Sequence, residues 1–186
     1  DKINPVLDVT FDGVHILNND IVSAQPNILM TFMDENKYLA LKDPTNFKVY
    51  IRNTNSSSPQ LVPYGPTLAF TPAVLPKNKC SLLYTPNLPD GTYELTVQGN
   101  DISGNLSANN NYKIDFQVIT KSMISEVLNY PNPFSTSTRF VFILTGKQIP
   151  TVFKIQIMTV SGKIVREISE DEIGPIHIGR NITQYA

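Results

Sequence analysis

The sequence predicts an all-β protein built from two tandem β-sandwich modules. Apolar residues recur at every second position over short segments, which is the spacing of a strand with one buried face. Clusters of proline, glycine and asparagine separate these segments, and helical periodicity is scarce. The 186 residues are enough for two small domains, and a hydrophobic fraction of 41% supports packed cores.

The first module contains six predicted strands. They lie at 7–13, 27–34, 47–52, 80–86, 91–99 and 112–119. In the third of these, Phe47, Val49 and Ile51 share one face, as period-two burial requires. The denser apolar run at 27–34 predicts a strand that is covered on both sides. The segments 53–60 and 62–72, rich in Ser, Pro and Gly, are predicted loops.

A turn before the fifth strand indicates the kind of sandwich. Pro89 fixes its own φ, and Asp90-Gly91 can take the bend that leads into the strand. Tyr93 then stands near the start of that strand, where a tyrosine corner would hold the turn through its hydroxyl group. We therefore expect an immunoglobulin-like β-sandwich over residues 1–120.

A second strand pattern begins after a polar linker predicted at 121–126, and the second module is expected to cover 127–186. Strands are predicted at 138–146 and 175–186. The segment 153–168 predicts a hairpin with its turn at Ser161-Gly162. Residues 169–174 are the only competitor for a helix and are too short to form one alone.

The stretch "YPNPFSTST" leads into the strand at 138–146. Pro131 and Pro133 each lack a backbone donor, so the segment suits the approach to a sheet rather than its middle. We expect Phe134 to enter the core, and the hydroxyl groups up to Thr138 to bond to nearby backbone as the strand begins.

Composition excludes several partner classes. Fifteen Lys and Arg against sixteen Asp and Glu leave a net charge of −1, which removes the basic surface on which nucleic-acid or anionic-lipid binding depends. No apolar stretch approaches the roughly 18 residues that a membrane span needs. The start "DKINPVLDV" has neither an initiator Met nor a signal segment, so we expect the chain to be a piece of a longer protein.

The side chains that could carry catalysis are few. Cys80 is the single cysteine, and the histidines are His15 and His177. A cysteine nucleophile needs a histidine within hydrogen-bond reach. Such a cysteine commonly lies on a strained turn or at a helix N-terminus, whereas Cys80 opens a predicted strand. We therefore interpret Cys80 as a packing residue and His177 as a residue of a sheet surface, and we predict no catalytic residues.

Oxygen ligands and tyrosines are the remaining candidates for binding. Weak calcium candidates are Asp34, Glu35, Asp43, Asp101 and Asn105. Neither loop that holds them has a regular calcium-binding pattern, so solvated loop charge is the favoured interpretation. A sugar-binding platform could include Tyr50, Tyr64, Tyr84, Tyr93 and Tyr112, although packing is favoured for most of them. Tyr50 is predicted to face away from the core.

Three segments of the second module carry a family resemblance. "YPNPFSTSTRFVF", "KIQIMTVSGKIVREI" and "GRNITQYA" resemble the C-terminal sorting-type β-module of proteins exported by the type IX secretion system of Bacteroidetes. This module is similar to an immunoglobulin-like module of the flagellar hook-capping protein. The upstream stretch "VTFDGVHILNNDIVSAQPNI" resembles the immunoglobulin-like region that precedes the sorting module in gingipain-type cysteine peptidases.

The resemblance implies a non-catalytic C-terminal region of a secreted or outer-membrane-surface protein. Such a region would act as a spacer and as a targeting module, and its partners would be the secretion machinery and the upstream domains of the parent protein, with no cofactor. Family members continue past the equivalent of Tyr185 with further strands, so the second module is expected to be incomplete, with an unpaired sheet edge and a partly uncovered core. The alternative is a glycan-binding or adhesive β-sandwich. A third interpretation is part of an enzyme whose active site is shared with another domain.

Overall fold

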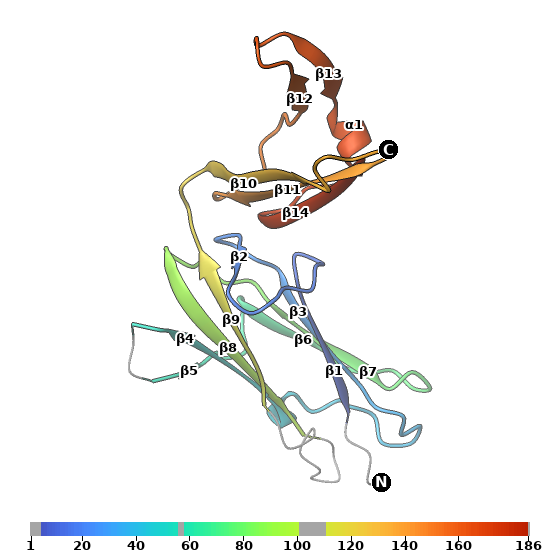
Figure 1. The fold of residues 1–186 in the computed structure, drawn as a ribbon. Coiled ribbons are helices and arrows are strands. Elements are labelled where there is room, and N and C mark those ends of the chain that lie inside the picture. The colour runs from blue at the N-terminus through green and yellow to red at the C-terminus, as the bar shows by residue number, and fades with distance from the viewer. Residues whose placement is uncertain (1–4, 56–57, 101–110, 186) are drawn as a thin grey trace. The chain divides into compact units, whose positions relative to one another are not determined.

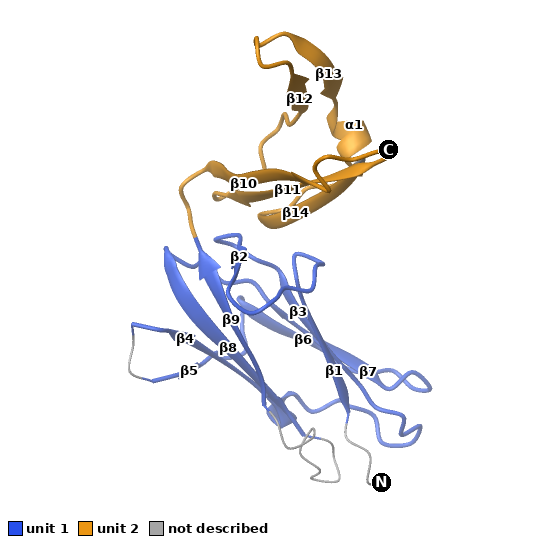
Figure 2. Cartoon of the chain, in the orientation of Figure 1, with its two compact units in different colours: residues 1–118 blue, residues 119–186 orange. Residues whose placement is uncertain are grey.

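The structure is a computed structural model that describes residues 5–55, 58–100 and 111–185. It divides into two compact units, unit 1 at residues 1–118 and unit 2 at residues 119–186 (Figure 2). The predicted all-β class is confirmed, because strands dominate both units and the helical segments are single turns (Figure 1).

Unit 1 is a sandwich of two sheets. One sheet has the order β1 (Val6–Phe11), β3 (Ile28–Met33), β7 (Lys79–Tyr84) and β6 (Leu68–Thr71). The other has the order β2 (Asp20–Val22), β9 (Tyr112–Val118), β8 (Gly91–Gly99), β4 (Phe47–Asn53) and β5 (Gln60–Leu61). Neighbouring strands are antiparallel except for β2 and β9. Two facing sheets of mostly antiparallel strands make this unit an all-β sandwich.

Aromatic rings join the two sheets. Phe11 on β1 packs against Phe116 on β9 with ring centroids 5.2 Å apart. Phe32 on β3 packs against Phe47 on β4 at 4.6 Å, and Phe47 also stacks on Phe70 of β6 at 5.6 Å. Each ring occupies an inward position of its strand, so the period-two pattern of the sequence produces the core directly.

The tyrosine corner predicted at Tyr93 is confirmed. Its hydroxyl donates to the carbonyl oxygen of Pro89 over 2.9 Å, and its ring is buried and stacks on Phe116. One side chain therefore fixes the turn before β8 and contributes to the core.

Unit 2 contains a three-stranded sheet and a separate hairpin. The sheet has the order β10 (Met123–Tyr130), β11 (Thr138–Thr145) and β14 (Gly179–Tyr185), and the hairpin pairs β12 (Ile155–Met158) with β13 (Ile164–Ile168). The predicted turn lies between these strands, with Gly162 at φ +83°. A one-turn helix, α1 (Glu170–Ile173), follows, and the Ser169 backbone N–H donates to Glu172 Oε2. The sequence analysis expected this segment to be too short for a helix. In the structure it forms a single turn, which the cap stabilises.

Several expectations about element boundaries are wrong. The predicted loop at 62–72 contains β6, and residues 123–126 of the predicted linker belong to β10. Leu29 and Met33 on β3 are 41% and 52% exposed, so the face that they share is covered only in part. Edge strands and boundary segments lack clear alternation because only part of their surface packs against other strands.

Phe134 does not enter the core as predicted. Its side chain is 51% exposed and lies in the connection between β10 and β11. The expected bonding of hydroxyl groups to backbone is found at Thr138, whose Oγ1 donates to the carbonyl oxygen of Pro131 over 3.0 Å.

Replacing Tyr93 by Phe keeps the ring and removes the bond to Pro89. We expect unit 1 to lose about 1 kcal/mol of unfolding free energy, the usual contribution of one hydrogen bond. Urea unfolding followed by circular dichroism measures this loss. Tyr38→Phe is the matched control, because Tyr38 is 90% exposed. Equal stability of the two variants would contradict a structural role for the Tyr93 hydroxyl.

Candidate functional site

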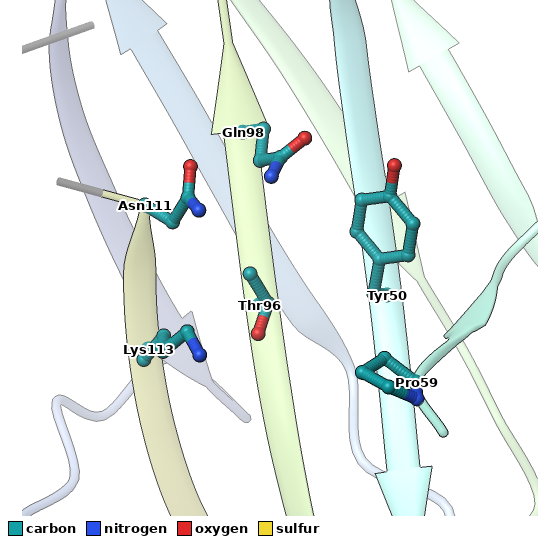
Figure 3. Close-up of a pocket in the computed structure, with 6 residues that line it drawn as sticks. All are labelled: Tyr50, Pro59, Thr96, Gln98, Asn111 and Lys113. Carbon is teal, nitrogen blue, oxygen red and sulfur yellow. The ribbon is translucent and has the colours of Figure 1, made fainter.

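A shallow hollow lies on the outward face of the five-stranded sheet of unit 1 (Figure 3). Its volume is about 330 Å³. The residues that line it are Tyr50, Pro59, Thr96, Gln98, Asn111 and Lys113. Strands β4, β8 and β9 supply most of them, and Pro59 comes from the segment that precedes β5.

The strand register explains why these side chains lie together. Tyr50 is opposite Thr96, and Thr96 is opposite Lys113, so the three form a row across β4, β8 and β9. Gln98 is two residues along β8 from Thr96 and therefore points to the same face. Asn111 comes just before β9 and lies on the same side of the row as Gln98 (Figure 3).

The polar groups of the hollow are only partly engaged. In the part of the chain that the structure describes, the side chains of Tyr50, Gln98 and Asn111 make no hydrogen bond to protein groups. Lys113 Nζ lies 3.9 Å from Glu94 Oε1, and the other oxygen of Glu94 accepts from Arg52 over 3.0 Å. The hollow therefore combines one aromatic ring with two amide groups and a cation that a ligand can reach.

Of the five tyrosines named as a possible platform, the structure brings only Tyr50 into this hollow. Tyr84 and Tyr93 are buried, which agrees with the packing interpretation, and burial raises the pKa of Tyr84. Tyr112 packs against the core, and burial, with a smaller effect of Asp8, raises its pKa. The Tyr64 hydroxyl donates to backbone carbonyl oxygens, and burial raises its pKa to about 12.

Cys80 is a core residue, as the sequence analysis expected. Its side chain is 1% exposed in β7, and burial raises the pKa of the thiol to about 12. His15 is exposed, and its Nε2 lies 2.7 Å from Asp8 Oδ1. The thiol is therefore protonated at neutral pH and inaccessible, which makes it a poor nucleophile.

The calcium candidates that can be described serve their own loops. Asp34 is buried, and its Oδ1 accepts from the backbone N–H of Asn36. Asp43 is exposed and caps the 3₁₀ turn η1 (Pro44–Asn46), where hydrogen bonds from Thr45, chiefly from its hydroxyl, lower the pKa of the Asp43 carboxyl group. Glu35 is exposed.

Asp101 and Asn105 lie outside the described residues, so their interpretation as solvated loop charge stays a prediction. Within the described ranges, no three His, Cys, Asp or Glu side chains come together as a metal site. His177 lies just before β14, not within it as expected, and its backbone N–H donates to the Asn181 side chain.

Unit 2 has an apolar groove between its sheet and its hairpin. The groove has a volume of about 320 Å³, and Val127, Phe134, Phe140, Ile155 and Ile157 are among its lining residues. Exposed apolar side chains are also frequent elsewhere in the unit. They include Met123, Ile124, Met158, Ile164, Val165 and Ile182.

No protein-family model and no curated protein matches this chain. Among the described residues, no helix has the length and apolar character required to cross a membrane.

The high pKa of the Cys80 thiol gives a testable outcome. Near pH 8 we expect the native protein to react with iodoacetamide at least about a hundredfold more slowly than the protein in guanidinium chloride, because the thiolate is the reacting species. Mass spectrometry of the alkylated protein follows the reaction. As pH rises, the native rate should stay low until the pH approaches the raised pKa. Equal rates for the native and unfolded protein would mean that Cys80 is accessible and reactive.

Proposed function

We propose that the chain is the non-catalytic C-terminal region of a secreted or surface-attached bacterial protein. In this proposal, unit 1 acts as a spacer and unit 2 engages the secretion apparatus. The resemblance of the second module to type IX sorting modules supports the targeting role. The packing of Cys80 in the core, away from His15, supports a non-catalytic region.

The main support from the structure is the exposed apolar surface of unit 2. A sorting module could use such a surface to pack against further strands or a partner. The three-stranded sheet has free edges at β10 and β14, and the hairpin pairs with no third strand in the described residues. An isolated two-stranded hairpin is marginally stable in water, so additional pairing would stabilise it.

The sequence elements that carry the resemblance also occupy distinct structural positions. The "YPNPF" stretch spans the end of β10 and the start of its connection to β11, and "KIQIMTVSGKIVREI" forms the β12–β13 hairpin. Phe134 and Ile155, one from each stretch, line the same groove. The two motifs therefore meet at one surface, where completing strands or a partner could bind.

Export of a reporter tests this proposal. The reporter carries a periplasmic signal peptide and is fused to unit 2. In a Bacteroidetes host with an active type IX system, we expect the reporter at the cell surface or in the medium. In an isogenic strain without the translocon, it should stay in the periplasm.

A fusion of the same reporter to unit 1 is the control and should stay in the periplasm of both strains. Retention of the unit 2 fusion in the active host would contradict the targeting role. Export that is independent of the translocon would contradict it as well.

A further inference from the structure

We propose that the hollow bounded by Tyr50, Gln98, Asn111 and Lys113 is a binding site for a neutral oligosaccharide. This proposal is independent of the export role, because it concerns only unit 1 and rests on different residues. The ligand class follows from three properties of the hollow: its aromatic surface, its amide groups and its charge balance.

The aromatic surface is the ring of Tyr50. The residue is half-buried, with Thr96 opposite it on β8 and Leu61 opposite it on β5. These neighbours restrict the ring, so little conformational entropy is lost when a ligand binds. A pyranose presents a face of C–H groups that packs well on such a ring, while its hydroxyl groups at the rim stay free for hydrogen bonds.

The amides of Gln98 and Asn111 supply the matching polar groups. Each amide carries a carbonyl acceptor and two N–H donors. A hydroxyl group is both a donor and an acceptor, so neighbouring sugar hydroxyls can bond to both ends of one amide. Because neither side chain bonds to protein groups in the described structure, no protein contact must be broken on binding.

The charges around the hollow nearly cancel. Glu94 lies close to both Arg52 and Lys113, and Asp115 is opposite Glu94 in the register of β8 and β9. Lys48, opposite Gln98 in the register of β4 and β8, is a third cation on this sheet face, so three cations against two carboxylates leave a net charge of only about +1. This small surplus favours a neutral ligand over a phosphate or a polyanion, which would need a larger surplus of positive charge.

A second hollow indicates a ligand longer than one sugar. It has a volume of about 570 Å³ and shares Lys113 with the first. Leu17, Asn18, Glu94 and Asp115 contribute to its lining. The two hollows extend across β8 and β9, so successive sugar residues could lie across the strands, with Leu17 offering an apolar contact at the far end.

Binding of defined oligosaccharides to the full 186-residue chain tests the site. The panel consists of cellohexaose, xylohexaose, mannohexaose and chitohexaose, with hexagalacturonate as the acidic arm. Calorimetry measures affinity, and NMR titration locates the perturbed amides. We expect at least one neutral hexasaccharide to bind and to perturb β4, β8 and β9.

Matched variants separate binding from folding. Tyr50→Ala should weaken the binding at least about tenfold, whereas Tyr38→Ala, which removes an exposed tyrosine elsewhere, should leave it unchanged. Gln98→Ala and Asn111→Ala should each weaken it about fivefold, the effect of losing one hydrogen bond. Circular dichroism and thermal unfolding show whether each variant is folded, and Tyr50→Phe keeps the ring if Tyr50→Ala fails to fold.

Three results would overturn the proposal. One is the absence of binding to every neutral member of the panel at millimolar concentration. Another is binding that Tyr50→Ala and Tyr38→Ala affect equally, or that perturbs amides outside β4, β8 and β9. The third is binding of hexagalacturonate alone with loss in Lys113→Gln, which would identify a charge-driven site for acidic ligands.

Discussion

The contact between phenylalanine rings of the two facing sheets is the interaction on which unit 1 depends. Phe11 and Phe116 form one bridge, and Phe32, Phe47 and Phe70 form another. Each of these rings takes an inward position on its own strand, so the residues next to it on that strand must point outward. The same constraint that builds the core therefore places Tyr50, next but one to Lys48 and Arg52 on β4, on the face that a ligand can reach.

Among the described residues, unit 2 has fewer buried apolar side chains than unit 1. Phe142 on β11 stacks on Phe153, with ring centroids 5.0 Å apart. Ile168 at the end of β13 and Ile173 in α1 are also buried. The groove beside these contacts remains open, and many apolar side chains stay exposed. Large exposed apolar surfaces generally mark interaction sites, and the role proposed for unit 2 depends on this surface.

Strands with strict alternation could be predicted from the sequence, and those at the sheet edges could not. The predicted strand at 47–52 nearly coincides with β4, and the predicted hairpin at 153–168 contains β12 and β13. Local alternation and turn residues determine these elements. By contrast, β2 has three residues and pairs in parallel with a strand almost a hundred positions away. Only tertiary contact stabilises such a strand, so its own sequence gives little sign of it.

The same distinction applies to the candidate site. The outward direction of Tyr50 followed from the parity of one strand. Gln98, Asn111 and Lys113 were not predicted, because their proximity to Tyr50 depends on the register between β4, β8 and β9. Period two shows which face a residue takes, whereas the neighbours on that face are set by pairing between distant segments.

Amide hydrogen exchange of the full chain tests most directly whether the core of unit 1 is fully covered while that of unit 2 is partly exposed. Inter-sheet packing protects the amides of β3, β7 and β8, so these should exchange by far the most slowly. The amides of β12 and β13 should exchange orders of magnitude faster, because the hairpin is covered on part of one face. Protection of β12 and β13 equal to that of β8 would contradict the account of a closed first sandwich and a partly open second unit.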